Sequence, residues 1–140
     1  MKITRIIVHA SDTFSDMNIG AKEIRKWHLD RGFSSIGYHY IIRRNGDVEI
    51  GRRCEDGNYV QGAHVLGLNA NSLGVCMVGG KARKGELACN YTRAQWRALE
   101  SLIFQLTTEY PDAEVSGHND HDKGKQCPTF NVRAWWRNTK

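Results

Sequence analysis

The chain has 140 residues, of which 40% are hydrophobic and 25% are charged, a composition typical of a single soluble globular domain spanning residues 1–140. The formal net charge is +5, and the basic residues are spread along the chain instead of forming a stripe. Without a recognised nucleic-acid motif, that spread disfavours a specific nucleic-acid binder and favours general attraction to anionic surfaces. The sequence contains no internal repeat, low-complexity run or membrane-spanning stretch, which argues against the repeat, disordered and membrane-spanning classes.

The N-terminus starts like a secretory signal, but its apolar run covers only residues 6–8, Ile-Ile-Val. A signal peptide needs an apolar region of about 7–15 residues. We therefore expect the protein to be made and kept in the cytoplasm, so that any target outside requires release through a separate pore-former. Four cysteines permit two disulfides, but a chain without a secretory signal does not favour that pairing.

The first half of the chain predicts a strand, a helix and a hairpin. Residues 3–10 are rich in β-branched side chains and predict a strand that ends at His9. Residues 20–33 have helical spacing, with Ile24, Trp27 and His28 as candidates for the inner face. Residues 37–51 hold two strand-like runs on either side of Asn-Gly, the signature of a hairpin with a type I′ turn.

The second half begins with a loop over residues 51–72 and a buried strand over residues 72–80, in which Cys76 is expected to act as a small hydrophobic residue. A basic connection follows. Thr92 and Gln95 then form a capping box before a strong amphipathic helix.

Pro111 ends that helix. Residues 113–118 predict a short strand ending at His118, and an amphipathic piece follows around residues 132–136. Strands and helices therefore mix, which predicts an α/β or α+β domain with a central sheet.

Two predicted strands end in histidine, at His9 and His118, and Cys127 follows nine residues after the second. Imidazole and thiolate ligands suit Zn²⁺, and three protein ligands leave a fourth position open for water. A cysteine ligand argues against Mg²⁺ or Ca²⁺. The spacing is not that of a zinc finger, so the residues alone do not show that His9 approaches the other two.

Each of these residues also has an ordinary interpretation. Taken alone, His9 is best read as a buried core histidine, and His118 and His121 as solvated loop residues. Cys127 can equally be a structural thiol or a nucleophile paired with His118. Lys125 can simply be exposed.

Five blocks of sequence resemble, in order, those of the bacteriophage T7-type lysozymes, and the resemblance runs from about residue 6 to residue 136. The blocks read IIVHAS, GYHYIIRRNGDVEIGR, GAHVLGLNANSLGVCMVGG, YTRAQWRAL and GHNDHDKGKQCPTF. That family consists of N-acetylmuramoyl-L-alanine amidases related to peptidoglycan recognition proteins. The resemblance implies an α/β domain with a central mixed β-sheet flanked by about three helices.

The resemblance also implies a Zn²⁺ ion held by His9, His118 and Cys127. The catalytic tyrosine of the family corresponds to Tyr38 in GYHY, and its catalytic lysine corresponds to Lys125 in KGKQC.

The loop between the histidine and cysteine ligands is one residue longer here than in the T7 protein, so Lys123 is an alternative to Lys125. The histidine of the family's HxxGxN block corresponds to His64, which is expected to line the substrate groove.

The remaining histidines and the C-terminal tryptophan pair are not predicted to be catalytic residues. His39 follows Tyr38, so strand alternation points it to the opposite face, in a structural or supporting role. His28 and His121 are predicted to be solvated, and residues 135–136, Trp-Trp, to pack in the core.

The leading hypothesis is a monomeric, zinc-dependent amidase of phage type that cleaves peptidoglycan. The alternatives are a non-catalytic peptidoglycan-binding module of the same fold, a nucleic-acid- or polymerase-binding protein, and a thiol hydrolase using Cys127 and His118. The T7-type protein also binds and inhibits its phage RNA polymerase, so the resemblance allows a similar second role.

Overall fold

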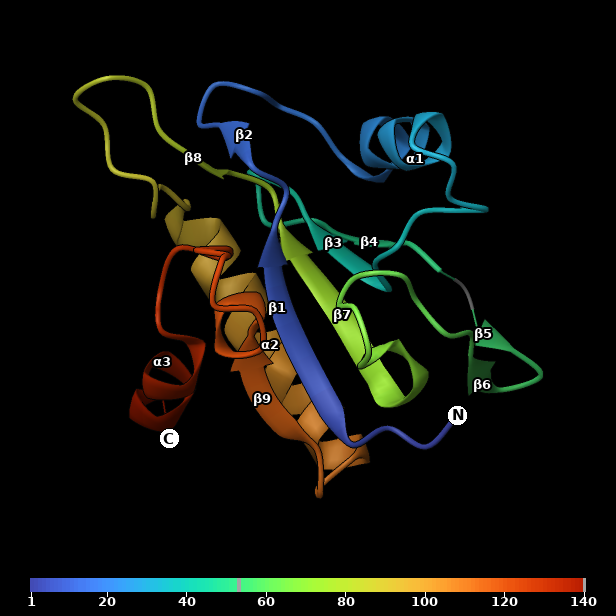
Figure 1. The fold of residues 1–140 in the computed structure, drawn as a ribbon. Helices are drawn as coiled ribbons and strands as arrows, with labels where there is room; N and C mark the ends of the chain where they lie inside the picture. Colours follow the sequence, from blue (N-terminus) through green and yellow to red (C-terminus); the bar gives the residue numbers. More distant parts are fainter. Residues whose placement is uncertain (53, 140) are drawn as a thin grey trace.

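A computed structural model describes residues 1–52 and 54–139. Figure 1 shows a central sheet with helices on both sides. The five strands of this sheet lie in the order β4-β3-β7-β1-β9. Their bounds are Val48–Ile50, Tyr40–Ile42, Ser72–Met77, Arg5–Ala10 and Glu114–Gly117. The three helices are α1 (Ala21–Asp30), α2 (Arg93–Glu109) and α3 (Val132–Asn138). The expected mixed sheet with three helices is confirmed.

Two small strand pairs and two short 3₁₀ helices complete the fold. Strand β2 pairs with β8 in parallel, and β5 pairs with β6 in antiparallel orientation. Their bounds are Thr13–Phe14, Gly80–Lys81, Cys54–Glu55 and Asn58–Tyr59, and the 3₁₀ helices are η1 (Asn69–Asn71) and η2 (His118–Asp120). Among the described residues, no helix combines the length and apolar character needed to cross a bilayer.

Four of the five sheet strands run parallel, and only the hairpin strand β4 is antiparallel. Parallel strands bring their carboxyl ends to one edge of the sheet, where ligands of open α/β sheets usually bind. In the register, His9 of β1 lies beside Cys76 of β7, and Val8 lies beside Gly117, the last residue of β9. His118 therefore begins next to His9.

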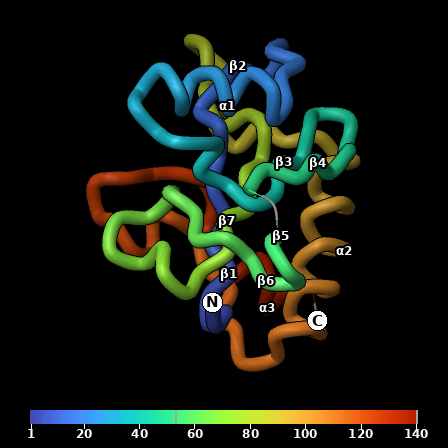
Figure 2. Tube along the Cα trace, turned by 90° about the vertical axis from the view of Figure 1, so that its right-hand side faces the viewer, coloured from blue at the N-terminus to red at the C-terminus, as the bar shows by residue number. Residues whose placement is uncertain are grey.

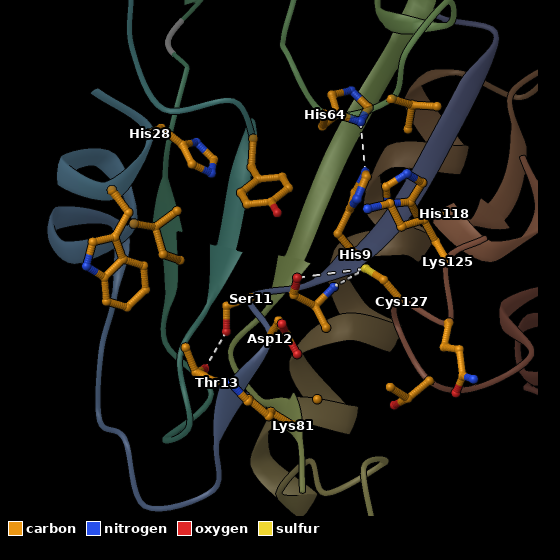
Figure 3. Close-up of a pocket in the computed structure, with 18 of the residues that line it drawn as sticks. His9, Ser11, Asp12, Thr13, His28, His64, Lys81, His118, Lys125 and Cys127 are labelled. Carbon is orange, nitrogen blue, oxygen red and sulfur yellow. Dashed lines mark hydrogen bonds between the residues drawn. The ribbon is translucent and has the colours of Figure 1, made fainter. Parts of the chain in front are cut away.

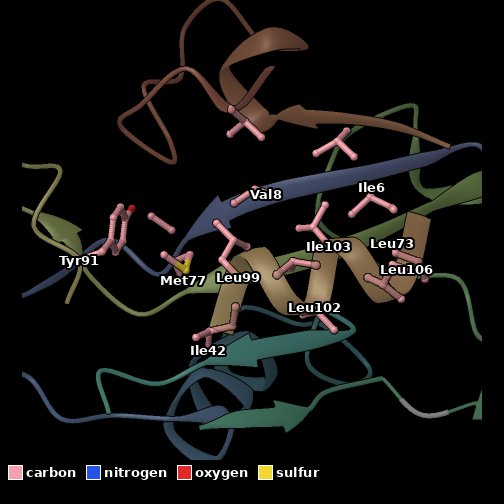
Figure 4. Packing of buried hydrophobic residues seen from close by; sticks show 14 of the residues in the cluster. Ile6, Val8, Ile42, Leu73, Met77, Tyr91, Leu99, Leu102, Ile103 and Leu106 are labelled. Carbon is pink, nitrogen blue, oxygen red and sulfur yellow. The ribbon is translucent and has the colours of Figure 1, made fainter. Parts of the chain in front are cut away.

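Alternate residues of the strands build the main core on one face of the sheet (Figure 4). From the strands, the apolar side chains of Ile6, Val8, Leu73 and Met77 are fully buried. They pack against apolar residues of α2, namely Leu99, Leu102, Ile103 and Leu106. Burying each such side chain contributes about 1.5–3 kcal/mol, so this face supplies most of the stability.

The opposite face has a smaller apolar cluster under α1, where Ile24 packs with Ile41 and Cys76. Figure 2 shows α2 on one side of the sheet, and α1, the loop around residues 60–70 and the loop before α3 on the other. No long helix crosses β1 and β9 on this second face within the described residues, so their polar residues are free to form a site.

The capping box predicted for α2 is confirmed and also joins two strands. Thr92 Oγ1 accepts the Gln95 N–H at 3.1 Å, and Gln95 Oε1 accepts the Thr92 N–H at 3.0 Å. The buried Gln95 amide nitrogen donates to the carbonyls of Ile42 and Val78 at 3.1 and 2.8 Å. The same side chain therefore starts the helix and fixes it to β3 and to the end of β7.

The predicted hairpin of β3 and β4 is confirmed, but its predicted turn type is wrong. A type I′ turn requires positive φ at both central residues. Of the pair, only Gly46 has a positive φ, of 91°. The Gly46 N–H donates to Arg43 O at 2.8 Å, and Asn45 Oδ1 accepts the Asp47 N–H at 2.9 Å. This is a three-residue loop with glycine in the left-handed position, favoured by the local bond of the asparagine side chain.

Helix α1 corrects the prediction for its inner face. Ile24 and His28 are buried as inner-face residues, as the helical spacing predicted, and His28 is 7% exposed, whereas Trp27 is 37% exposed. Residues 24 and 28 are one helical turn apart and share the inner face, which turns residue 27 toward the rim. The prediction that His28 is solvated is wrong.

Candidate metal centre and active-site cleft

A cleft of about 1170 Å³ opens at the carboxyl edge of the sheet, on the face not covered by α2 (Figure 3). Segments far apart in sequence form its walls: the end of β1, helix α1, the loop around His64, the β2–β8 pair and the loop before α3. The cleft is open to solvent and bordered by charges of both signs, including Asp12, Lys81 and Lys125. It is therefore suited to an extended polar ligand.

His9, His118 and Cys127 meet at the floor of this cleft. One side-chain nitrogen or sulfur atom from each lies within 4.8 Å of the other two. His9 is buried on β1 with 1% exposure, while His118 starts η2 directly after β9. The parallel pairing of β1 and β9 is what brings the two histidines together, with ring centroids 4.7 Å apart.

Cys127 is held in place from three sides. The Ala10 N–H donates to Cys127 Sγ at 3.0 Å, and the Asn119 N–H donates to the Cys127 carbonyl at 2.8 Å. One residue further on, the Tyr91 hydroxyl donates to the Pro128 carbonyl at 2.6 Å. The sulfur is thereby aimed at the histidines.

The protonation states of the group are compatible with a cation as its partner, provided that the thiol gives up its proton when the cation binds. Burial raises the pKa of the Cys127 thiol to about 11, although the Ala10 amide acts to lower it. Without a positive partner the thiol stays protonated at neutral pH, which disfavours a free thiolate nucleophile. Burial lowers the pKa of His9 well below its usual value and that of His118 more moderately, so both rings are neutral and able to ligate.

The group fits Zn²⁺ by chemistry and by spacing. Two imidazoles and one thiolate are zinc ligands, and tetrahedral bonds of about 2.0–2.3 Å set ligand atoms about 3.3–3.8 Å apart. The observed upper limit of 4.8 Å is close enough for small side-chain movements to close the site. The cleft leaves one side of the group open, as a catalytic site requires.

Tyr38 lines the cleft beside this group. Its ring lies 5.1 Å from that of His9 and 5.4 Å from that of His28. Burial raises the pKa of the Tyr38 phenol well above its usual value. The hydroxyl therefore stays protonated and can act as a hydrogen-bond donor.

Lys125 is exposed and lines the cleft, two residues before Cys127. The other sequence candidate, Lys123, is not among the described residues that line the cleft. The Lys125 N–H donates to the Asp122 carbonyl at 3.0 Å, in a turn that separates the two lysines. Of these two lysines, the geometry therefore favours Lys125 as the one that faces the cleft.

His64 lines the cleft, as the resemblance implied, and also contacts His9. The distance from His9 Nε2 to His64 Nδ1 is 2.8 Å, and His64 Nε2 lies 3.2 Å from Ser72 Oγ. Asn69 Oδ1 accepts the N–H groups of His64 and Val65 at 2.8 and 2.9 Å, which fixes the loop. Burial lowers the pKa of His64 to about 3, so the ring is neutral. Sequence reasoning missed the contact with His9, which is 55 residues away.

The other histidines have structural partners. His39 is fully buried: its Nδ1 accepts the Gly74 N–H at 3.0 Å and its Nε2 donates to Val60 O at 2.7 Å. His28 Nδ1 accepts the Gly37 N–H at 2.8 Å. His121 is partly buried, not solvated as predicted, and bonds the hydroxyl of Ser116.

The cysteines and the tryptophan pair agree with their sequence-based interpretation. All four cysteines are free, and Cys76 is fully buried. Trp135 and Trp136 are partly buried and pack against the main core. Trp135 lies 6.0 Å from the Trp96 ring and 6.2 Å from the Phe130 ring.

Sequence reasoning missed one wall of the cleft, formed by β2 and β8. Two cations lie over the ring of Phe14. The Lys81 ammonium is 4.9 Å from the ring centroid and the Arg83 guanidinium is 4.0 Å from it. Arg83 also binds the Asp16 carboxylate at 3.1 and 3.2 Å. The sequence signal was a phenylalanine in one turn-rich segment and a basic run in another, with nothing to show that they pair.

Comparison with known proteins agrees with this geometry. The model of the N-acetylmuramoyl-L-alanine amidase family matches residues 1–130. The endolysin of Klebsiella phage KP32 is 45% identical over 133 residues, covering 95% of this chain and 85% of the relative. The endolysin of Escherichia phage T7 is 42% identical over 131 residues, covering 94% of this chain and 83% of the relative.

Solved structures share the fold. N-acetylmuramoyl-L-alanine amidase LysC from Clostridium intestinale superposes with a TM-score of 0.77 at 27% identity, covering 96% of this chain and 82% of that one. Drosophila PGRP-LB superposes with a TM-score of 0.74 at 23% identity, covering 96% of this chain and 79% of that one. At this identity the likeness shows a shared fold alone. Since the family model and the endolysin relatives both extend over more than nine-tenths of its length, this chain belongs to the N-acetylmuramoyl-L-alanine amidase family.

Proposed function

We propose that this protein is a zinc-dependent peptidoglycan hydrolase. It cleaves the amide bond between the lactyl group of N-acetylmuramic acid and the first L-alanine of the stem peptide. The observation that carries the proposal is the convergence of His9, His118 and Cys127 at the floor of an open cleft. Membership of the amidase family and the endolysin relatives support the choice of bond.

His9, His118 and Cys127 would hold the metal. When bound, Zn²⁺ lowers the pKa of a coordinated water toward about 7 and polarises a carbonyl oxygen, which together overcome the inertness of an amide. The neutral imidazoles of the buried His9 and the half-buried His118, and the Ala10 N–H aimed at the sulfur, prepare the ligand set before the metal arrives.

Tyr38 and Lys125 would stabilise the charge that develops when the amide carbonyl is attacked. The Lys125 ammonium supplies a positive charge at the cleft, where negative charge grows on the carbonyl oxygen. The Tyr38 hydroxyl, kept protonated by burial, donates a hydrogen bond to that oxygen or to the attacking water. His64 lines the same cleft and would contact the substrate or, through His9, the metal site.

The endolysin relatives support a proposal for the biological setting, in which the protein acts on the cell wall. We propose that the protein is a monomer, that it is stored in the cytoplasm and that it reaches peptidoglycan through a separate pore-former. A second role in binding a phage RNA polymerase stays a prediction.

Two alternatives predict different behaviour. A non-catalytic peptidoglycan-binding module does not need a complete ligand set, whereas here all three candidate ligands are present. A thiol hydrolase needs a reactive thiolate, whereas burial raises the pKa of Cys127 to about 11.

The test is digestion of purified peptidoglycan with and without a chelator, followed by addition of zinc. We expect release of new N-terminal alanine that chelation abolishes, zinc restores and Cys127→Ser lacks. New reducing sugar ends would instead indicate a glycosidase. Binding without any release would support the binding module, and chelator-resistant activity that alkylation destroys would support the thiol hydrolase.

A further inference from the structure

A chain of hydrogen bonds leads from the backbone to the candidate metal ligand His9. Ser72 Oγ lies 2.7 Å from Leu68 O and 3.2 Å from His64 Nε2, and His64 Nδ1 lies 2.8 Å from His9 Nε2. Figure 3 shows the His64 ring above His9, with this last bond drawn. Ser72 is fully buried and does not line the cleft.

The carbonyl at the start of the chain sets the direction of every proton. A carbonyl only accepts, so the single hydroxyl proton of Ser72 goes to Leu68 O, the shorter of its two contacts. Ser72 must then accept from His64, which places the proton of that ring on Nε2. The neutral His64 ring therefore has a lone pair on Nδ1 and accepts the Nε2–H of His9. His9 is left with an unprotonated Nδ1.

The fold makes room for His64 at this position. A Cβ atom on Gly74 would lie 2.7 Å from His64 Cγ, and one on Gly62 would lie 2.9 Å from His64 Cδ2. The ring therefore packs against β7 where that strand has no side chain. The two bonds that Asn69 accepts from backbone N–H groups hold the loop that carries the ring.

We propose that His64, oriented by Ser72, is a positioning residue that keeps the proton of His9 on Nε2 and its Nδ1 free to bind the metal. The proposal rests on the proposed function in one respect, namely that His9 is a metal ligand. It goes beyond a place for His64 in the substrate groove, because it assigns His64 a role in metal affinity before substrate binds. Partners of this kind typically change metal affinity by about 10–100-fold.

Removal of the serine hydroxyl has a defined consequence. In Ser72→Ala, His64 Nε2 loses the hydroxyl acceptor and keeps only its interaction with the backbone of Ser72, so the Nε2–H form is less favoured and part of the rings hold the proton on Nδ1. An Nδ1–H would face His9 Nε2 and drive the His9 proton onto Nδ1, where it blocks the metal. Ser72 contacts neither the cleft nor the metal ligands, so this effect reaches the site only through His64.

The first measurement is the affinity of the purified protein for Zn²⁺, by competition with a chromophoric chelator. We expect Ser72→Ala and His64→Phe to bind Zn²⁺ about 10–100-fold more weakly than the wild type. His64→Asn, whose side-chain oxygen can replace Nδ1 as acceptor, should recover part of the loss. The matched control is Ser116→Ala, which removes an equally buried hydroxyl bonded to His121, a residue outside the ligand group.

The second measurement is the tautomer of His9 in the metal-free protein, from long-range ¹H–¹⁵N NMR correlations of the imidazole ring. We expect Nε2–H in the wild type and in Ser116→Ala, and Nδ1–H or a mixture in Ser72→Ala. A loss of packing alone would not move the proton between the ring nitrogens. If Ser72→Ala does not fold, the tautomer of His9 in the wild type still tests the proposal, because the proposal requires Nε2–H.

The proposal is overturned by Nδ1–H on His9 in the wild type, by unchanged zinc affinity in Ser72→Ala, or by an equal loss of affinity in Ser116→Ala. Neither measurement requires peptidoglycan. A wild-type protein that binds zinc with the expected tautomer but releases no N-terminal alanine would refute the proposed function and leave this inference standing.

Discussion

The two faces of the central sheet are built from alternate residues of the same strands, and they differ in what they bury. On the α2 face, β1 and β7 contribute isoleucine, valine, leucine and methionine side chains to one apolar core. On the other face, the same two strands contribute His9, Ser72 and Gly74, and also Cys76, which packs in the smaller apolar cluster under α1. A single residue separates a stabilising side chain from a chemical one.

The comparison teaches how a small domain buries polar groups. The cleft-face groups satisfy one another: His64 with His9 and Ser72, and His39 with the Gly74 N–H. An unpaired buried polar group costs about 1–3 kcal/mol, whereas a paired one costs little. The apolar face can therefore carry the stability while the polar face carries the site, and substitutions on the two faces should have separable effects.

The largest effect on stability is expected on the apolar face. Leu99→Ala removes a fully buried side chain of α2 and should lower the free energy of unfolding by about 2–5 kcal/mol, measured by denaturant titration. Zinc affinity and specific activity of the folded protein should not change. Phe104→Ala, on the exposed side of the same helix, is the control and should fall within about 0.5 kcal/mol of the wild type. A large loss of zinc affinity in Leu99→Ala would show that the faces are coupled.

On the cleft face, Lys125→Met should lower kcat by about 100–1000-fold, because the role proposed for Lys125 is to stabilise the charge that develops on the carbonyl oxygen. Zinc content and unfolding free energy should stay at wild-type values. The matched variant Lys123→Met, just outside the cleft, should keep its activity. The measurement is the steady-state amidase kinetics of both variants. A large loss of kcat in Lys123→Met with normal kcat in Lys125→Met would assign the stabilisation of the oxyanion to Lys123.

A pH-dependent effect should also belong to the cleft face. Burial lowers the pKa of His64 to about 3, against about 6.5 in the unfolded chain. Between these values the unfolded state holds a proton that the folded state lacks. The contribution of His64 to the free energy of unfolding is therefore fully present above about pH 6.5, and it decreases as the pH is lowered, by up to about 1.4 kcal/mol per pH unit.

The measurement is the unfolding free energy of the metal-free protein from pH 7 to pH 4. His64→Gln removes the titrating group. The slope of its unfolding free energy against pH should therefore be smaller, by an amount equivalent to the uptake of up to one proton on unfolding. Parallel curves for the two proteins would mean that His64 is already protonated in the folded state.

The smallest effect is expected at the rim, which belongs to neither face. Asp16→Asn breaks the ion pair between Asp16 and Arg83. The side chain of Asp16 is 67% exposed and that of Arg83 is 52% exposed. Exposed pairs contribute about 0–1 kcal/mol and are screened by salt. Unfolding at low and high ionic strength should show a small loss that salt removes. A loss as large as that of Leu99→Ala would make the β2–β8 wall part of the folding core.

Local features of the fold could be predicted because their causes are local. The capping box of Thr92 and Gln95 depends on residues three apart, and the hairpin on two alternating runs around one turn. The prediction of a type I′ turn was wrong because Asn45 bonds Asp47 in a different local conformation. Trp27 was misplaced because hydrophobicity does not say which residue of a helix faces a cleft.

The sequence by itself determined the periodicities and the caps, and it singled out His9, His118 and Cys127 as candidate metal ligands. Only the tertiary structure decided that these three meet, because the β1–β9 pairing and the loop before α3 join positions more than one hundred residues apart. The same holds for the bond between His9 and His64, and for the pairing of β2 with β8. Periodicity reports the face on which a side chain lies, whereas contact between distant segments depends on strand order and register, which emerge only when the whole core packs.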